Sequence, residues 1–274
     1  MKNKRLDVLL VERGLAETPA IAQRVIMAGQ VRVNGQIVIN SSILLESEAD
    51  ICIEHGQRFV SRGGEKLDAA ITAFKVDVSG LICADVGAST GGFTDCLLQH
   101  GAQRVYAIDV GHGILEWKLR QDERVIVMEK TNARFVKNLP EAVAFVTIDV
   151  SFISLRLILP VIKGWFPTTG CSVITLIKPQ FEVDRQAAAR CKGVVRDPNL
   201  HRQTITNVLA FAQEIEFGVM GLIRSPLLGP KGNVEFLAHL IYPHMDKNDL
   251  EEIIENVVIP TPQIVDESIS HSTT

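Results

Sequence analysis

The chain has 274 residues, of which 46% are hydrophobic and 22% charged, and its formal net charge is -4. This apolar content can bury a large core, so a wholly disordered chain is excluded and one full domain with a smaller one is expected. The charge balance excludes a strongly basic protein, and every apolar run is shorter than the roughly 18 residues that a membrane span needs.

The acidic balance arises at one end of the chain. Residues 246–274 hold seven acids and one base, and the rest of the chain has 27 bases against 25 acids. Residues 1–34 carry six bases and three acids. This local excess is compatible with RNA contact and equally with an ordinary solvated surface.

The N-terminal stretch MKNKRLDVLLVERG carries charges where a secretory signal has an apolar core, so a soluble cytoplasmic protein is expected. The cysteines are odd in number and nowhere form a Cys-x-x-Cys pair; they are Cys52, Cys83, Cys96, Cys171 and Cys191. This pattern predicts neither a disulfide framework nor a zinc site. His239 and His244 lack metal-ligand spacing, and no metal site is predicted.

Residues 1–57 have the pattern of a small module of two helices and a hairpin. RLDVLLVERG and AIAQRVIMAG each space apolar residues at helical intervals and end at a glycine. VRVNGQIV then alternates apolar and polar residues around Asn34 and Gly35, a pair that suits a two-residue hairpin turn. This order resembles the RNA-binding module first described in ribosomal small-subunit protein four, over about residues 4–57.

The resemblance implies phosphate contacts by basic residues. Members of that family commonly open the second helix with a basic residue, where this chain has Pro19 and Ala20. The candidate RNA contacts are two arginines of the module and two of the linker at 58–64: Arg24, Arg32, Arg58 and Arg62. In the linker, Gly63 and Gly64 permit a hinge or a sharp turn. A small cap that packs on the larger domain and touches no RNA is the alternative.

Residues 65–245 alternate apolar runs with amphipathic stretches, as in LICADVG, RVYAIDV, AFVTIDVSF and CSVITLIKP. This alternation predicts an α/β fold with a parallel sheet covered on both faces. GVMGLIRSPL and NVEFLAHLIY follow without a helix between them, so an antiparallel hairpin is expected at the end of the sheet. In the acidic tail, residues 246–274, DLEEIIENVVIP is predicted to form an amphipathic helix that ends at Pro260.

The stretch ADVGASTGGFTD, residues 84–95, has the pattern of a strand, a glycine turn and a helix. It lacks the Gly-x-Gly-x-x-Gly of dinucleotide enzymes, and an acid before the first glycine would repel a pyrophosphate. A ligand with a positive or neutral centre and a ribose is favoured, and S-adenosylmethionine fits this description. The expected cofactor contacts are Asp85, Gly87, Ser89, Gly91, Asp109 and Asn132. A tight turn that binds no ligand is the alternative.

Four ionisable residues stand at predicted strand ends or near them: Lys66, Asp149, Lys178 and Glu235. The carboxyl ends of strands converge on the ligand crevice of an open α/β sheet. A lysine that directly follows the run CSVITLI is costly to bury without a partner, so acids are expected beside Lys178. For each residue alone, a structural ion pair is the alternative.

Five segments together resemble the TlyA family, relatives of the FtsJ-type ribose methyltransferases, over residues 4 to about 245: SRGGEKL, DVGASTGGFTD, TIDVSFISL, LIKPQFE and GPKGNVEFL. The resemblance implies a Rossmann-like, S-adenosylmethionine-dependent methyltransferase sheet that acts on ribosomal RNA. It also implies a catalytic tetrad of Lys66, Asp149, Lys178 and Glu235. The chemistry agrees, because a ribose 2′-hydroxyl is a poor nucleophile that needs proton removal or charge stabilisation. Lys178 is expected nearest to the 2′-oxygen, as a neutral base or as a cationic clamp.

Three other functions stay open. A base methyltransferase would use a segment like DVSF, where Phe152 offers an aromatic ring, and a non-catalytic RNA-binding or ribosome-assembly factor would retain the fold. A hemolysin is the third, because the TlyA family often carries that name, although no apolar span or secretion signal supports it. The basic segment PQFEVDRQAAARCKGVVRDPNLHR is interpreted as an RNA-contacting flap or as a charged, mobile surface loop. The RNA, the nucleotide and the oligomeric state are not predicted.

Overall fold

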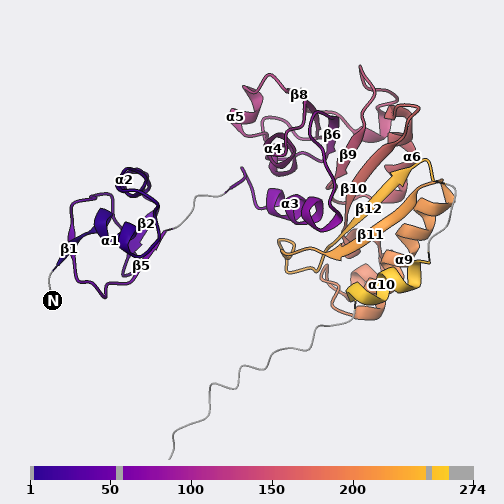
Figure 1. Cartoon of the computed structure of the whole chain (residues 1–274). Coiled ribbons are helices and arrows are strands. Elements are labelled where there is room, and N and C mark those ends of the chain that lie inside the picture. The colour runs from indigo at the N-terminus through magenta and orange to yellow at the C-terminus, as the bar shows by residue number, and fades with distance from the viewer. Residues whose placement is uncertain (1–2, 54–57, 245–248, 259–274) are drawn as a thin grey trace, which may run out of the picture. The chain divides into compact units, whose positions relative to one another are not determined.

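The chain divides into two compact units in a computed structural model that describes residues 3–53, 58–244 and 249–258. The first unit covers residues 1–58 and the second covers residues 59–274. Each unit has its own arrangement of helices and strands (Figure 1).

The first unit folds as two helices and short antiparallel strands. Its elements are β1 (Lys4–Arg5), α1 (Leu6–Glu12), α2 (Pro19–Met27), β2 (Val31–Val33), β3 (Gln36–Ile37), β4 (Leu44–Leu45) and β5 (Ile51–Ile53). Thr18 caps α2, since its hydroxyl accepts a hydrogen bond from the Ile21 amide at 3.3 Å. Asn34 and Gly35 have φ angles of 49° and 80°, the left-handed values that a two-residue hairpin turn requires. The predicted helix, helix and hairpin are confirmed.

The second unit is built on a seven-stranded sheet in the order β11-β12-β10-β9-β6-β7-β8. Its strands are β6 (Ile82–Val86), β7 (Arg104–Ile108), β8 (Val125–Met128), β9 (Phe145–Ile148), β10 (Cys171–Ile177), β11 (Gly218–Arg224) and β12 (Phe236–Tyr242). Neighbours from β10 to β8 pair in parallel, whereas β12 runs antiparallel to both β10 and β11. The predicted parallel sheet and its closing hairpin are therefore confirmed.

Helices cover both faces of this sheet (Figure 1). They are α3 (Gly63–Phe74), α4 (Gly92–Gln99), α5 (Trp117–Arg120), α6 (Leu159–Ile162), α7 (Pro179–Glu182), α8 (Arg185–Arg190), α9 (Pro198–Glu214) and α10 (Leu250–Val258), with 3-10 turns at Ala133–Phe135, Leu155–Leu157 and Lys163–Trp165. One core cluster joins α3, α4 and α5 to the sheet, and the other joins α6, α9 and α10 to its opposite face. The predicted tail helix forms, and its expected end at Pro260 lies outside the described residues.

Gly63 and Gly64 lie inside a helix, so the predicted hinge is wrong. They open the first turn of α3. A Cβ on Gly64 would stand 2.2 Å from Cγ of Phe59, whose side chain is buried against this turn. The glycine is needed for close packing rather than for flexibility.

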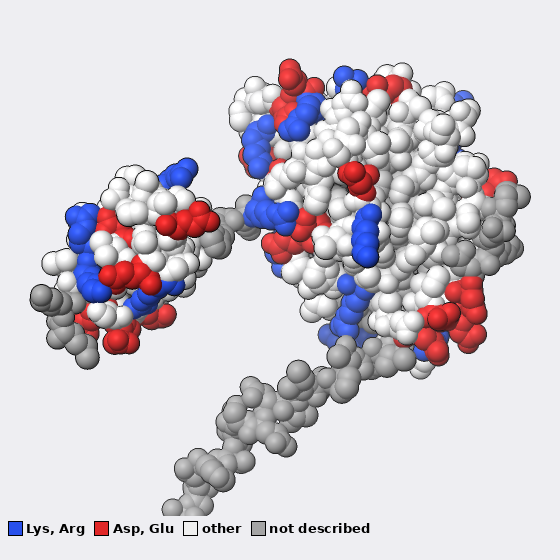
Figure 2. Space-filling view, viewed as in Figure 1, with Lys and Arg blue, Asp and Glu red and all other residues white. Residues whose placement is uncertain are grey.

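The basic segment after β10 also contains more regular structure than a loop, because α7, α8 and the first turn of α9 all lie within it. Over the described ranges, none of the helices combines the length and the apolar character that crossing a membrane requires. On the face of the first unit that Figure 2 shows, Lys and Arg side chains stand among Asp and Glu side chains. That face has no unbroken basic patch, in agreement with the modest charge excess of residues 1–34.

Candidate active site

Three of the charged residues predicted for the site stand at the carboxyl ends of strands in the middle of the sheet. Asp109 follows β7, Asp149 follows β9 and Lys178 follows β10. In the sheet, β6 lies between β7 and β9. The chain continues from β6 to β7 on one side and later adds β9 on the other side of β6, so the strand order reverses at β6. Ligands of open α/β sheets bind above the carboxyl ends of strands at such a reversal of strand order.

Two cavities open over these strand ends and share one wall. The larger cavity, of about 940 Å³, reaches over the ends of β6 and β7, and the smaller, of about 570 Å³, reaches toward α3 and the segment before β12. The residues that line both are Gly87, Ser89, Asp149, Ser151, Phe152 and Phe181. Two ligands, one in each cavity, would meet at this shared wall.

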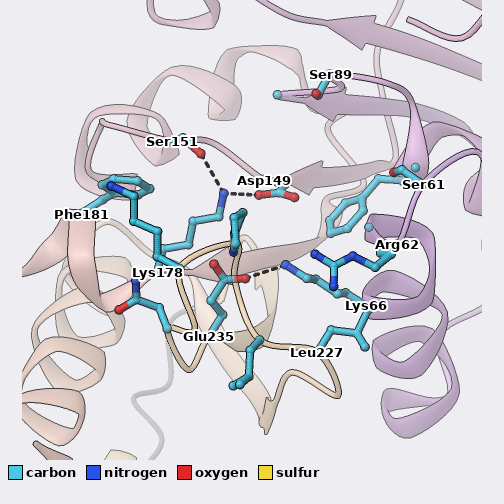
Figure 3. A pocket seen from close by; sticks show the side chains of 18 of the residues that line it. Ser61, Arg62, Lys66, Ser89, Asp149, Ser151, Lys178, Phe181, Leu227 and Glu235 are labelled. Atoms are coloured by element: carbon cyan, nitrogen blue, oxygen red, sulfur yellow. Dashed lines mark hydrogen bonds and ion pairs between the residues drawn. The ribbon is translucent and has the colours of Figure 1, made fainter. Parts of the chain in front are cut away.

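All four residues of the predicted tetrad line the smaller cavity, where they form two ion pairs (Figure 3). Lys178 Nζ lies 2.6 Å from Asp149 Oδ1 and donates a hydrogen bond to Ser151 Oγ at 2.9 Å. Lys66 Nζ lies 2.6 Å from Glu235 Oε2. Lys66 is 8% exposed and Glu235 is 1% exposed, so the second pair is largely removed from water.

Strand pairing places Lys178 and Glu235 at the same edge of the sheet. Ile177, the last residue of β10, pairs with Phe236, the first residue of the antiparallel β12. Lys178 directly follows Ile177 and Glu235 directly precedes Phe236, so both residues lie at the same level at this edge of the sheet. Gln180 Nε2 donates a hydrogen bond to Glu235 Oε1 at 3.4 Å, which orients this carboxylate further.

Asp109 and Asn132 line the larger cavity, together with Gly87 and Ser89. Asp109 accepts hydrogen bonds from the amides of Ser89 at 2.8 Å and Gly111 at 2.7 Å. Its carboxylate therefore links the turn that follows β6 to the turn that follows β7. Asn132 caps the 3-10 turn at Ala133–Phe135 with its side chain. Each oxygen of a carboxylate has two lone pairs, so Asp109 retains the capacity to accept further hydrogen bonds.

The glycine turn that follows β6 packs tightly against β9. Gly87 has a φ angle of 88°, and a Cβ there would stand 2.4 Å from the carbonyl oxygen of Asp149. Gly91 has a φ angle of 96°, and a Cβ on it would stand 2.2 Å from Leu119 Cδ1. Gly87 therefore belongs to the cavity wall, whereas Gly91, which lines neither cavity, supports the turn from behind.

Asp85 lies behind the turn, which differs from the expected cofactor contact. Its side chain is fully buried and accepts hydrogen bonds from Thr94 Oγ1 at 2.7 Å and Thr147 Oγ1 at 3.0 Å. Burial raises the pKa of Asp85 to about 7, although both threonine hydroxyls act to lower it. This carboxyl group joins β6, β9 and α4, and it lines neither cavity.

The replacement Asp85→Asn is expected to flatten the pH dependence of stability. The pKa of an aspartate is near 4 in an unfolded chain, and burial raises the pKa of Asp85 to about 7 in the folded protein. Between these pH values the folded protein therefore binds more protons than the unfolded chain. The stability of the unmodified protein should therefore fall as the pH rises from about 4 to about 7 on account of this group. Urea unfolding at pH 5 and pH 8 checks this: the variant should gain stability relative to the unmodified protein at pH 8, and an equal difference at both values would contradict it.

The predicted RNA contacts occupy different places. Arg62 lines the smaller cavity and extends toward it beside Lys66 (Figure 3). Arg24 is exposed on α2, and Arg58 is exposed at the end of the first unit. Arg32 is partly buried and donates a hydrogen bond to the carbonyl of Gly35 at 2.9 Å, within the hairpin.

Several residues of the cavities were not predicted as site residues. Ser151 accepts a hydrogen bond from Lys178, and the ring of Phe181 lies below the Lys178 ammonium. The ring of Phe152 is 90% exposed, and its centroid lies 4.8 Å from that of the Phe181 ring. Lys231, from the segment before β12, also lines the smaller cavity. Phe152 and Lys231 belong to the segments TIDVSFISL and GPKGNVEFL, which carry the family resemblance. The spacing of residues in these segments does not indicate that the two side chains face a cavity.

A mostly parallel seven-stranded sheet closed by an antiparallel hairpin, with a glycine turn after β6 and an acid at the end of β7, defines the second unit as a Rossmann-like methyltransferase fold. Residues 59–242 match the model of the FtsJ-like methyltransferase family, and residues 4–51 match the S4 domain. The chain belongs to the TlyA family of FtsJ-like methyltransferases and begins with an S4 domain.

Three similar proteins illustrate the relationship. YqxC of Bacillus subtilis, named as a candidate rRNA methyltransferase, is 48% identical over 88% of this chain and 87% of its own length. The 16S/23S rRNA (cytidine-2'-O)-methyltransferase TlyA of Mycobacterium tuberculosis is 41% identical over 87% of this chain and 90% of its own. A solved structure from Streptococcus thermophilus, titled as a candidate hemolysin, matches with a TM-score of 0.71 and 42% identity over 94% of this chain and 95% of that one.

Proposed function

We propose that this protein transfers a methyl group from S-adenosylmethionine to a ribose 2′-hydroxyl of ribosomal RNA. The observation that carries the proposal is the position of Lys178 in the smaller cavity, where it is held by Asp149 and Ser151, two residues of the wall that the two cavities share. A cofactor in the larger cavity and a nucleotide in the smaller one meet at this lysine. The activity named for the M. tuberculosis relative supports the choice of RNA and of the ribose hydroxyl.

The residues of the larger cavity fit S-adenosylmethionine. Asp109 would accept hydrogen bonds from the ribose hydroxyls of the cofactor, Asn132 would contact the adenine, and Gly87 and Ser89 would contact the methionine part. When bound, S-adenosylmethionine supplies a methyl group on a positively charged sulfur. Asp85 supports this site by holding the turn in place from behind.

The tetrad supplies what the hydroxyl acceptor needs. As the 2′-oxygen forms its bond to the methyl carbon and the bond from that carbon to sulfur breaks, the hydroxyl proton must leave. Lys178 either takes this proton as a neutral amine or, as a cation, stabilises the negative charge on oxygen while the proton passes to water. Asp149 holds the Lys178 Nζ in the cavity. Lys66 and Glu235, the second ion pair in the same cavity, would position the ribose.

Basic residues around the smaller cavity suit an RNA strand. Arg62 and Lys231 line it in addition to the two lysines of the tetrad, so phosphates on either side of the target ribose would meet positive charge. The S4 domain, with Arg24 and Arg32, and Arg58 at the end of the first unit would contribute contacts outside the cavity. A ribosomal subunit or ribosomal RNA is the proposed partner.

Methyl transfer from labelled S-adenosylmethionine to separate ribosomal subunits of a strain that lacks this protein tests the function. The RNA is then hydrolysed with alkali, which cannot cleave the linkage next to a 2′-O-methyl group. Label in an alkali-resistant dinucleotide supports the proposal and identifies the subunit. Label in mononucleotides would show a base methyltransferase, the function that the exposed Phe152 favours next. No label on either subunit or on free ribosomal RNA would contradict catalysis.

The replacement Asp109→Ala is expected to weaken S-adenosylmethionine binding by about tenfold or more, because a carboxylate that would accept hydrogen bonds from hydroxyls is lost and the turns at Ser89 and Gly111 lose their hydrogen-bond acceptor. Isothermal titration calorimetry measures the dissociation constant. Glu123→Ala, an exposed acid outside both cavities, serves as the control and should bind normally. Equal affinity in the Asp109 variant would remove this residue from the proposed site.

The replacement Phe152→Ala is expected to lower RNA affinity and turnover by about tenfold without loss of stability. The backbone of Phe152 has a φ angle of 63°, and its exposed ring lies at the cavities. Stacking of a base on an aromatic ring is worth about 1–3 kcal/mol of binding free energy. The measurement compares methylation at sub-saturating RNA with that of Phe135→Ala, whose ring is 73% exposed and lines neither cavity. Equal losses in the two variants would contradict a stacking role for Phe152.

A further inference from the structure

A cysteine, a histidine and an aspartate meet between α3 and α4, outside both cavities. Asp68 comes from α3, and Cys96 and His100 come from α4 and its C-terminal cap. His100 Nε2 lies 2.8 Å from Asp68 Oδ1, and one ligand atom of each of the three residues lies within 4.8 Å of the others. None of the three lines either cavity, so the proposed methyltransferase site gives them no role.

The spacing of the group follows from helix geometry. Cys96 and His100 are four residues apart, which places their side chains on one face of the end of α4. The helices α3 and α4 pack against each other, and this contact brings Asp68 across from α3. The sequence pattern did not reveal the group, because it contains one cysteine and one histidine and its third member lies 28 residues before Cys96.

These donors match the preferences of zinc. Thiolate, imidazole and carboxylate are the three kinds of side chain that bind Zn²⁺, and sites with three protein ligands keep a fourth position for water. The side chains of Asp68 and His100 are 21% and 28% exposed, so water reaches one side of the group, whereas Cys96 is buried on the other. A cation would therefore enter from the solvent side and meet the sulfur within the protein.

The distances require small movements of the side chains. With metal–ligand bonds of about 2.0–2.3 Å, tetrahedral ligand atoms are about 3.3–3.6 Å apart. The Asp68–His100 contact of 2.8 Å would have to lengthen by about half an ångström, and the sulfur would have to move closer by up to about 1.5 Å. Rotation about side-chain bonds provides movements of this size without a change of the helices.

We infer that Asp68, Cys96 and His100 form a binding site for one zinc ion or a cation of similar chemistry, with water as the fourth ligand. The ion would tie α3 to α4. Lys66 lies in the first turn of α3 and the glycine turn leads directly into α4, so the ion would stabilise the scaffold on which both cavities are built. This inference does not depend on the reaction that the protein catalyses.

Cobalt substitution tests the site on the full chain, produced without a polyhistidine tag. Metal-free, reduced protein is titrated with Co²⁺ and then with Zn²⁺. We expect one equivalent of Co²⁺ to produce a thiolate-to-cobalt charge-transfer band and the visible bands of tetrahedral cobalt, and Zn²⁺ to abolish both. The absence of a charge-transfer band at one equivalent would overturn the inference.

Variants locate the site. Cys96→Ser should remove the charge-transfer band, and His100→Gln and Asp68→Asn should weaken Co²⁺ binding by at least about 100-fold, since even indirect partners of metal ligands contribute 10–100-fold. Cys52→Ser and His112→Gln, at exposed positions outside the group, should bind as the unmodified protein does. A band that persists in Cys96→Ser, or that disappears in Cys52→Ser, would overturn the assignment.

Thermal unfolding provides a readout that separates a metal site from a simple ion pair. Zn²⁺ should raise the melting temperature of the unmodified protein by several degrees and leave that of His100→Gln unchanged. His100→Gln and Asp68→Asn replace partly exposed side chains, so both should fold even if the buried Cys96 does not tolerate replacement. A melting temperature that Zn²⁺ leaves unchanged in the unmodified protein would show that Asp68 and His100 form an ion pair only.

Discussion

Alanine in place of Lys178 is expected to lower the rate of methyl transfer by about a thousandfold or more while the affinity for S-adenosylmethionine changes by no more than about threefold. Lys178 lines the smaller cavity and not the larger one, so its loss removes the charged group nearest to the acceptor and leaves the proposed cofactor contacts in place. Asp149 and Ser151 would lose the partner that joins them.

Single-turnover methylation at saturating cofactor measures the first quantity, and calorimetry measures the second. Lys137→Ala, an exposed lysine that lines neither cavity, is the matched control and should behave as the unmodified protein. Lost cofactor binding with normal turnover at saturating cofactor would show that Lys178 belongs to the cofactor site instead.

The arginine variant of the same residue distinguishes the two roles left open for Lys178. Arg retains the positive charge and cannot act as a base in a protein. Turnover of Lys178→Arg well above that of the alanine variant would support a cationic clamp. Turnover equal to that of the alanine variant, with Asp149 still bound in a structure of the variant, would support proton removal by the lysine.

Much of the fold could be predicted because its signals are local. The runs CSVITLI and FVTI are mostly apolar, as is typical of strands buried on both faces, and each is followed by a charged residue. Parallel strands bring their carboxyl ends to one edge, so Asp149 and Lys178 had to lie close together. The hairpin that returns Glu235 to this edge was visible in the absence of a helix between its two strands.

The rest depends on contacts between distant segments, which no local pattern records. Gly64 is helical because the ring of Phe59 packs on it, whereas two adjacent glycines by themselves indicate a flexible turn. Asp85 turns into the core because Thr94 and Thr147 donate to it from two other elements. Phe152 faces the cavities because of a left-handed backbone conformation that its sequence neighbours do not require.

The buried pair of Lys66 and Glu235 is expected to have large effects on both stability and catalysis. Glu235→Ala leaves the Lys66 ammonium in a site that is 8% exposed without its carboxylate, and breaking a buried pair in this way costs about 3–5 kcal/mol of unfolding free energy. Turnover should fall as well, because Lys66, which lines the cavity where the ribose would bind, loses the carboxylate that orients it.

A double replacement separates the two effects. Lys66→Met combined with Glu235→Leu removes both charges, and replacing a buried pair with apolar residues is often neutral for stability. The double variant should therefore unfold at nearly the urea concentration of the unmodified protein while its methyl transfer stays as low as that of Glu235→Ala. Urea unfolding of the three proteins and their single-turnover rates provide the comparison.

The matched control is Glu255→Ala, which breaks the exposed pair of Arg202 and Glu255 in the same unit. Its partners are 3.4 Å apart with side chains 39% and 55% exposed, so water screens both charges and the loss should not exceed about 1 kcal/mol. Equal destabilisation by the Glu235 and Glu255 replacements would mean that the Lys66 pair is hydrated in solution. Recovery of turnover in the double variant would mean that the pair serves only to fold the protein, since the charges themselves would then be dispensable for the reaction.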